Sequence, residues 1–244
     1  MNKNSHRHSL IHSFCLSAAL AVNPPPAQAL PVVSDTVPGN VSVQNVGLKE
    51  LQITAGDGAI LHHYSFDVAA DETVRFVQPS ADARVLNRIL PTSSPSQIDG
   101  KLIGNGHVYL LNPSGVIFGE GSVVETGKLH AVAGSLYDHD FIDRKDNFTS
   151  LLGEVRNMGS ITAGEVVMAG SRVVNSGRIH APEGLVVMVA GPGSGVELSS
   201  RSGGVSVTVI PAGSGGNSSA SSDLAGQALL LSGVVEASRL EIHA

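Results

Sequence analysis

Short apolar runs alternate with turn residues along most of the chain after residue 30. For example, Thr73 to Val77 precedes Gln78-Pro79-Ser80, and Leu51-Gln52-Ile53 precedes a Gly- and Asp-containing turn. Alternating apolar positions bounded by Gly, Pro, Asp and Ser are typical of strands joined by tight turns. A helical period is best matched over Asp82 to Leu90, which is therefore predicted either as a brief turn of helix or as a strand. The pattern as a whole predicts an all-β protein.

Five residues recur as an internal repeat with the pattern Gly, any residue, aliphatic, any residue, Ala. The copies are Gly127 to Ala131, Gly159 to Ala163, Gly177 to Ala181 and Gly233 to Ala237. Asn157 and Asn175 precede the second and third copies, which stand 18 residues apart. A period of this size predicts a solenoid, and 18 residues suit one turn of a three-faced parallel β-helix.

The repeat assigns a physical role to each of its positions. The aliphatic residue, such as Ile161, is expected to point inward, while its neighbours Ser160 and Thr162 point outward. We expect Gly127, Gly159, Gly177 and Gly233 to serve corners that need a positive φ or a close approach of two backbones. Asn157 and Asn175 are expected to stack at a corner, with each side-chain amide bonding the next.

Composition supports many short strands more than helices. The chain has 28 glycines among 244 residues, 42% hydrophobic residues and only 4% aromatic residues. Its net charge is −6, and a surface of that sign argues against nucleic acid and anionic lipid as partners.

Residues 1–29 are predicted to be a secretory signal peptide. Lys3 and Arg7 precede an apolar run of Ile11 to Val22, and Ala27-Gln28-Ala29 supplies a cleavage site of small residues. A transmembrane anchor is the alternative, but this run is shorter than the roughly 20 residues that span a bilayer. The single cysteine, Cys15, lies within this segment, so the mature chain is expected to have no disulfide.

The rest of the chain divides by composition. Residues 30–211 carry the strand pattern, with Val196 to Leu198 and Val205 to Ile210 still alternating. Residues 212–223 are rich in Gly and Ser and are predicted to be a loop. Residues 224–244 resume the repeat, as a further β-helix turn or the truncated start of a passenger. The end of the chain is expected to be loosely capped or to continue in a partner chain.

The most specific segment runs from Gly106 to Gly119. It is predicted to form a strand over His107 to Leu111, a turn over Asn112-Pro113-Ser114-Gly115, and a strand over Val116 to Phe118. Asn at the first position, Pro at the second and Gly at the fourth favour a type I turn. The Asn112 side chain can also bond its own backbone two residues further on.

This segment and its surroundings resemble the filamentous-haemagglutinin-type N-terminal secretion domain of two-partner secretion exoproteins. The resemblance rests on Ser65 to Phe76, Val85 to Ile89, Pro95 to Gly100 and Leu110 to Gly119, in that order. It implies that residues 30–211 are a two-partner secretion (haemagglutination activity) domain. The implied fold is a right-handed parallel β-helix (β-solenoid) with an N-terminal cap and extra-helical hairpins.

The same resemblance implies function and partners. The chain is expected to be the secretion domain of an adhesin-like exoprotein that passes through the periplasm to the cell surface or the medium. Its implied partner is an outer-membrane β-barrel transporter with periplasmic recognition modules, and a host or neighbouring cell surface is a further candidate. The residues implied in recognition are those of the motif turn and two upstream patches: Asn112, Pro113, Ser114, Gly115, Asn87, Gln97 and Ile98.

No residue pattern predicts a catalytic, cofactor or metal site. Neighbouring residues on a strand face opposite ways, so His62 and His63 are not expected to share an ion. Asp138-His139-Asp140 lies in a polar stretch, Asp138 to Asn147, that is predicted to be a solvated loop. The alternative is a carbohydrate-active β-helix enzyme, which needs carboxylates gathered on one face. Its candidates appear scattered along the sequence: Glu154, Glu165, Glu183 and Glu197.

Overall fold

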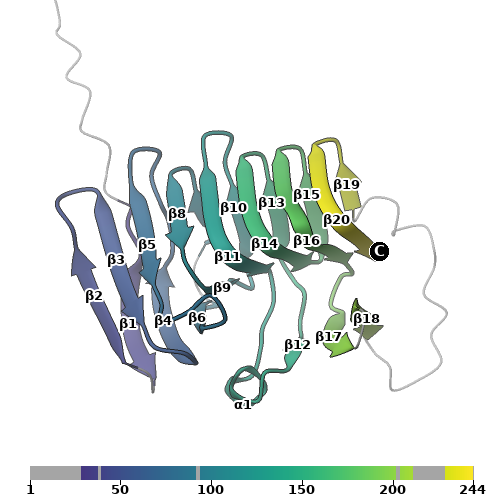
Figure 1. The fold of residues 1–244 in the computed structure, drawn as a ribbon, viewed down its shortest axis with the longest axis horizontal. Helices are drawn as coiled ribbons and strands as arrows, with labels where there is room; N and C mark the ends of the chain where they lie inside the picture. Colours follow the sequence, from purple (N-terminus) through teal and green to yellow (C-terminus); the bar gives the residue numbers. More distant parts are fainter. Residues whose placement is uncertain (1–28, 38–39, 92–93, 202–203, 211–228, 244) are drawn as a thin grey trace, which may run out of the picture.

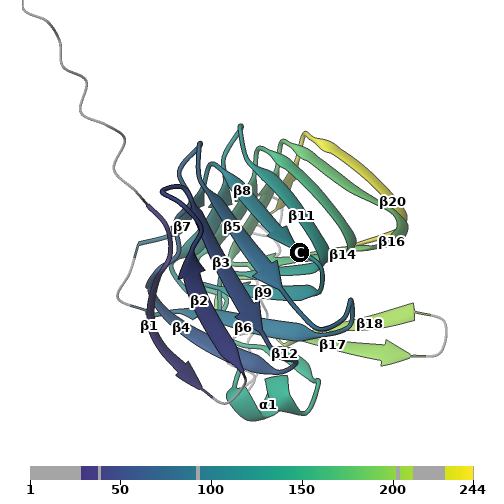
Figure 2. The same cartoon turned by 60° about the vertical axis from the view of Figure 1, so that its left-hand side comes forward.

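The chain winds into a parallel β-helix with three faces (Figures 1 and 2). The computed structural model describes residues 29–37, 40–91, 94–201, 204–210 and 229–243. The predicted signal peptide and the predicted Gly/Ser-rich loop lie outside the described residues, apart from Ala29.

Each face is a stack of parallel strands. The first face holds β3 (Glu50–Ala55), β5 (Thr73–Val77), β8 (Lys101–Gly104) and the first halves of β11 (Val123–Val132), β14 (Ser160–Gly170), β16 (Arg178–Ala190) and β20 (Val234–His243). The second face holds β4 (Ala59–Ser65), β6 (Arg84–Ile89), β9 (His107–Leu111) and the second halves of those four long strands. The third face holds β7 (Ser96–Ile98), β10 (Gly115–Phe118), β13 (Glu154–Asn157), β15 (Arg172–Asn175) and β19 (Leu229–Leu231). The segment with an ambiguous pattern, Asp82 to Leu90, contains strand β6.

Aliphatic side chains fill the interior in columns that run along the axis. One column on the first face consists of Leu51, Val74, Leu102, Val124, Ile161, Ile179 and Val235, each paired with the next. The first six are buried in one hydrophobic cluster, and Val235 packs against it. Each fully buried side chain of this size contributes about 1.5–3 kcal/mol to folding, so the columns supply the main stabilising term. The inward position predicted for Ile161 is confirmed.

Two antiparallel strands cap the N-terminal end of the helix. Strand β1 (Val32–Val37) pairs with β4, and β2 (Val41–Asn45) pairs with β3, both antiparallel. This is the N-terminal cap that the family resemblance implied.

A layer outside the helix covers part of the second face. It comprises α1 (Asp138–Ile142), β12 (Asp146–Phe148), β17 (Gly195–Arg201) and β18 (Gly204–Ile210), and the last three form an antiparallel sheet. The prediction that residues 138–147 form a solvated loop is wrong in part. Phe141 and the adjoining Phe148 are buried in a second hydrophobic cluster against the outer side of the helix. The aromatic residues anchor a segment in which Asp138, His139 and Asp143 remain accessible, whereas Asp140 is buried.

The 18-residue period holds on the first and third faces. Asn157 pairs with Asn175, and Ile161 pairs with Ile179. The next copy, at Gly233, is 56 residues further on, because the β17–β18 hairpin and residues 211–228 intervene between the two turns. The copy at Gly127 is out of register with the others, because Leu129 pairs with Val166 rather than with Ile161. Gly127 therefore stands at a different corner, next to Gly164.

The glycines of the repeat allow two backbones to approach closely, and they do so without a positive φ. A Cβ on Gly177 would lie 2.2 Å from the carbonyl oxygen of Gly159, and one on Gly233 would lie 2.0 Å from that of Gly177. A side chain at either position would push neighbouring turns apart.

The predicted stacking of asparagines forms between two turns. Asn157 Nδ2 donates to Asn175 Oδ1 at 2.8 Å, and Asn157 Oδ1 accepts from the backbone N–H of Gly159 at 3.1 Å. Both side chains are fully buried. The stack stops there, because Phe118 precedes Asn157 and Leu231 follows Asn175 in register.

We expect Gly177→Ala to lower the free energy of unfolding by about 1–3 kcal/mol, because the new methyl group overlaps a backbone carbonyl that cannot swing aside. Gly121→Ala is the matched control, since its Cβ would meet no atom closer than 3.6 Å. Urea titration followed by circular dichroism measures both. Equal stability of the two variants would contradict the close-approach role.

We expect Asn157→Ala and Asn175→Ala to be coupled. Each variant leaves a buried amide without its partner and costs about 1–3 kcal/mol. The double variant loses less than the sum, by about 1 kcal/mol, because the bond is already lost in either single variant. A double-mutant cycle with denaturant checks this, and additive effects would show that the amides do not interact.

Candidate functional site

The motif turn lies where the chain passes from the second face to the third. The backbone N–H of Gly115 donates to the carbonyl of Asn112 at 2.9 Å, as the predicted type I turn requires. Asn112 Oδ1 also accepts from the backbone N–H of Ser114 at 2.9 Å. Gly115 has a φ of +131°, and a Cβ there would lie 2.9 Å from the carbonyl of Glu154. Both the backbone conformation and the space favour glycine.

Asn112 also ties the turn to the preceding turn of the helix. Its Nδ2 donates to the carbonyl of Ser94 at 2.9 Å and to Ser96 Oγ at 3.1 Å. The side chain is fully buried, so each of its polar atoms is used inside the fold. Asn112 therefore links two consecutive turns of the β-helix by hydrogen bonds.

The structure brings the upstream patches next to this turn. Gln97 and Ile98 belong to β7, which pairs with β10 directly after the motif turn, and Ile98 lies opposite Phe118. Gln97 is half-buried and donates to Asp99 Oδ1 at 2.7 Å. Asn87 lies on β6 opposite Leu110, two residues before Asn112.

Asn87 holds a polar pair inside the core. Its Nδ2 donates to the carbonyl of Tyr109 at 3.1 Å, and its Oδ1 lies 3.0 Å from Nε2 of His63. Burial lowers the pKa of His63 to about 4, so this ring is neutral near pH 7. His62 points the other way and lies 3.2 Å from an Arg88 nitrogen, as expected for adjacent strand residues.

Most of the implied recognition residues are therefore hidden in the folded protein. Asn87, Ile98, Asn112 and Gly115 are buried, whereas Gln97, Pro113 and Ser114 are half-buried. Near this segment the folded surface exposes mainly the backbone of a turn and only parts of the side chains of Pro113 and Ser114.

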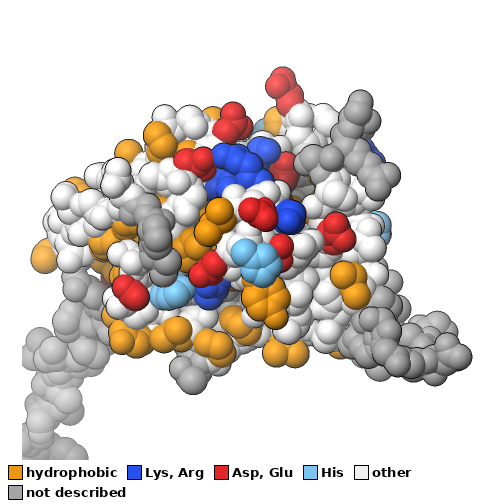
Figure 3. Space-filling model, turned by 90° about the horizontal axis from the view of Figure 1, so that it is seen from below, with side chains coloured by type: hydrophobic (Ala, Val, Ile, Leu, Met, Phe, Trp, Pro, Cys, Tyr) orange, Lys and Arg blue, Asp and Glu red, His pale blue; other side chains and the backbone are white. Residues whose placement is uncertain are grey.

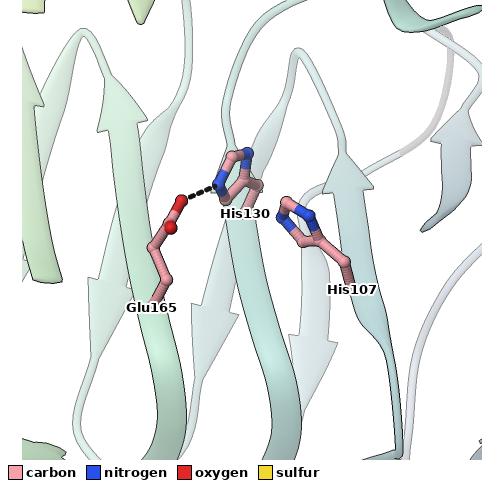
Figure 4. A group of neighbouring side chains, drawn as sticks. All are labelled: His107, His130 and Glu165. Atoms are coloured by element: carbon pink, nitrogen blue, oxygen red, sulfur yellow. Dashed lines mark hydrogen bonds and ion pairs between the residues drawn. The ribbon is translucent and has the colours of Figure 1, made fainter. Parts of the chain in front are cut away.

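A second polar group was not predicted from the sequence. His107, His130 and Glu165 lie within reach of one another on the outer side of the second face (Figure 4). Nε2 of His130 lies 3.1 Å from Glu165 Oε1, and the two histidine rings stand edge to face with centroids 4.3 Å apart. The residues are 23 and 35 positions apart in the sequence, so only the register of the turns reveals the group. Lys128 lies opposite His107 on one side and opposite Glu165 on the other. A correct prediction of this strand register would have revealed the group.

Burial and charge set the protonation of this group. Burial, helped by the nearby charges of His130, Lys128 and Arg84, strongly lowers the pKa of His107. Burial raises the pKa of Glu165, but the hydrogen bond from His130 and the charge of Lys128 outweigh it and bring the pKa to about 2. Near pH 7, His107 is therefore neutral and Glu165 is a carboxylate.

Around the outer layer, acidic, basic and histidine side chains mix with apolar ones (Figure 3). Arg88 pairs with Asp138 at 2.5 Å, and Arg144 pairs with Asp57 at 2.7 Å. Among the described residues, Asp138, His139 and Asp140 form no group of three ligands for one ion. The described part of the chain contains no helix with the length and hydropathy of a membrane span.

Curated relatives share about a third of the matched residues. A heme/hemopexin-binding protein of Haemophilus influenzae is 33% identical over 166 residues, which are 64% of this chain and 18% of that protein. A second heme/hemopexin-binding protein of Haemophilus influenzae is 35% identical over 128 residues, 52% of this chain and 13% of that protein. The chain thus spans less than a fifth of the length of these relatives.

Solved structures of secretion domains share the fold. The HMW1 secretion domain from Haemophilus influenzae superposes with a TM-score of 0.63 at 27% identity, covering 73% of this chain and 48% of that one. The filamentous hemagglutinin secretion domain gives a TM-score of 0.56 at 16% identity, covering 88% and 99%. The model of the TPS secretion domain family matches residues 27–243. The chain therefore belongs to the family of two-partner secretion (TPS) domains.

Proposed function

We propose that this chain directs an adhesin-like exoprotein through the periplasm to an outer-membrane β-barrel transporter, and that periplasmic modules of the transporter recognise it. It then folds at the cell surface or in the medium. The observation that carries the proposal is the TPS secretion-domain match over residues 27–243, together with the intact motif turn.

Recognition of the motif segment takes place before folding. Asn87, Ile98 and Asn112 are buried in the finished domain and offer no side chain to a partner. The same segments are extended strands in the helix, and an extended segment can add as a strand to the sheet of a recognition module. The backbone groups that such a module binds are those that β7 and β10 later use to pair with each other, and that β9 uses to pair with β6 and β11.

This competition gives the transporter a means of release. Once neighbouring turns have formed outside the cell, their strands offer the same hydrogen bonds and also bury apolar side chains such as Val116 and Phe118. Folding thus removes the segment from the module and favours outward movement, since no ATP is available beyond the inner membrane. Each added turn makes return less favourable.

The region shared with the heme/hemopexin-binding relatives covers 18% or less of those proteins. It therefore supports a common secretion domain and assigns none of their ligands to this chain.

We expect Asn112→Ala to reduce secretion more than it reduces expression. The variant removes the side chain that sets the motif turn, and Gly115→Val is expected to act likewise because of its φ of +131°. The measurement is the ratio of secreted to cell-associated protein in cells that also express the transporter.

Asn157→Ala is the control for this experiment, because it breaks a buried side-chain hydrogen bond of similar length one turn further along the helix, outside the motif turn. Both variants destabilise the folded domain, so melting temperatures are compared first. Equal secretion of the two variants at matched stability would mean that the motif turn matters only for folding.

The enzyme alternative has a direct assay. Among the described carboxylates, Glu154 pairs with Arg156 and Arg172, and Glu165 pairs with His130 and Lys128. We expect the folded chain to release no new sugar ends from pectin-like acidic polysaccharides. Depolymerisation that is lost in Glu165→Gln would overturn this assignment.

A further inference from the structure

The group of His107, His130 and Glu165 is held by three consecutive turns of the helix. His107 begins β9, His130 lies in β11 and Glu165 in β14. His107 and Glu165 both pair with Lys128, and His130 stands two residues further along on the same side of its strand. One ligand atom from each of the three side chains lies within 4.8 Å of the others. In Figure 4 the side chains of His107 and Glu165 lie on opposite sides of His130.

Both rings are buried and carry nitrogens without partners. His107 is 6% exposed and His130 is fully buried. Within the described part of the chain, Nε2 of His107 and Nδ1 of His130 have no hydrogen-bond partner. Buried polar atoms are satisfied in the great majority of cases, so the orphan Nε2 of His107, close to His130 and Glu165, points to a ligand.

The donors match one class of ligand. Two imidazole nitrogens and one carboxylate oxygen are the donors that Zn²⁺ and its neighbours among the divalent transition metals take, whereas Mg²⁺ and Ca²⁺ take mainly oxygen. We propose that His107, His130 and Glu165 bind a divalent transition-metal ion, with Zn²⁺ as the first candidate.

Solvent can reach this position to complete the coordination. A hollow of about 370 Å³ opens beside it and is lined by Asp82, Arg84, His107, Tyr109, Lys128, Arg144, Asp146 and Glu165. The bond between His130 Nε2 and Glu165 Oε1 would be replaced by bonds from both atoms to the ion. The ion would then tie β9, β11 and β14 together beneath the outer layer.

The charged side chains around the hollow include some that oppose and some that favour the binding of a cation. Arg84 donates to the carbonyl of Phe141 at 2.7 Å, and Arg144 pairs with Asp57, so both cations have partners of their own. Lys128 is the direct competitor, because its Nζ lies 3.3 Å from Glu165 Oε2. Asp82 and Asp146 line the same hollow and offset part of this positive charge.

The test uses the full folded chain, stripped with a chelator and titrated with ZnCl₂ by isothermal calorimetry. CoCl₂ serves as a spectroscopic probe, because its visible absorption reports coordination by nitrogen. We expect one ion per chain with a Kd below about 10 µM. His107→Gln and Glu165→Gln are each expected to weaken binding at least about tenfold, and Lys128→Met to strengthen it.

His180→Gln is the matched control. His180 lies 2.8 Å from Glu236 and so forms another histidine–carboxylate pair, but it is exposed and belongs to no group of three ligands among the described residues. Its loss should leave Zn²⁺ affinity unchanged.

Three results would overturn the site: no saturable binding to the unaltered chain, unchanged affinity in both ligand variants, or an equal loss in His180→Gln. Circular dichroism first establishes that each variant is folded. The cobalt spectrum of the unaltered chain and the affinity of Lys128→Met do not depend on variants of the buried residues.

Discussion

The structure depends on hydrogen bonds between the backbones of successive turns, and these require the turns to lie in direct contact at a corner. The carbonyls of Gly100, Ser122, Gly159 and Gly177 each accept from the first N–H of the strand in the next turn, at 2.8–3.1 Å. At such distances a side chain between the turns has no room. Where serine replaces glycine in this row, Ser122 turns its hydroxyl to the carbonyl of Gly119 at 2.8 Å. The aliphatic columns follow from this spacing, since strands held in register bring equal positions together.

The repetitive part of the fold could be predicted from the sequence because one turn contacts only the next. The 18-residue spacing between Asn157 and Asn175, which matches the spacing of the repeat, was sufficient to predict their register and hydrogen bond. The copy at Gly127 was wrongly grouped with the other three, because the same five-residue pattern occurs at two different corners of the β-helix. Only the observed strand pairing distinguishes the two corners. The outer layer was predicted poorly for a different reason. Phe141 and Phe148 lie in a polar segment without a period, and the surface they cover is formed by residues far away in sequence.

The same distinction applies to the two sites. The motif turn is local, so its residue preferences revealed its geometry, including the bond from Asn112 to the backbone of Ser114. The group of His107, His130 and Glu165 is long-range, and none of its members stands in a recognisable motif. Asn112 and Gly115 of the motif are buried, and in the folded chain Asn112 joins neighbouring turns. Presentation of this segment to a partner is the role proposed for the same sequence at an earlier time, while the chain is extended.

The cap has a consequence for how copies of this protein can associate. Its strands β1 and β2 run opposite to the helical strands on which they lie. A helix from another molecule that approached this end would meet strands of the wrong direction and could not continue the winding. A parallel β-helix that continues without interruption through two molecules is thereby excluded at this end.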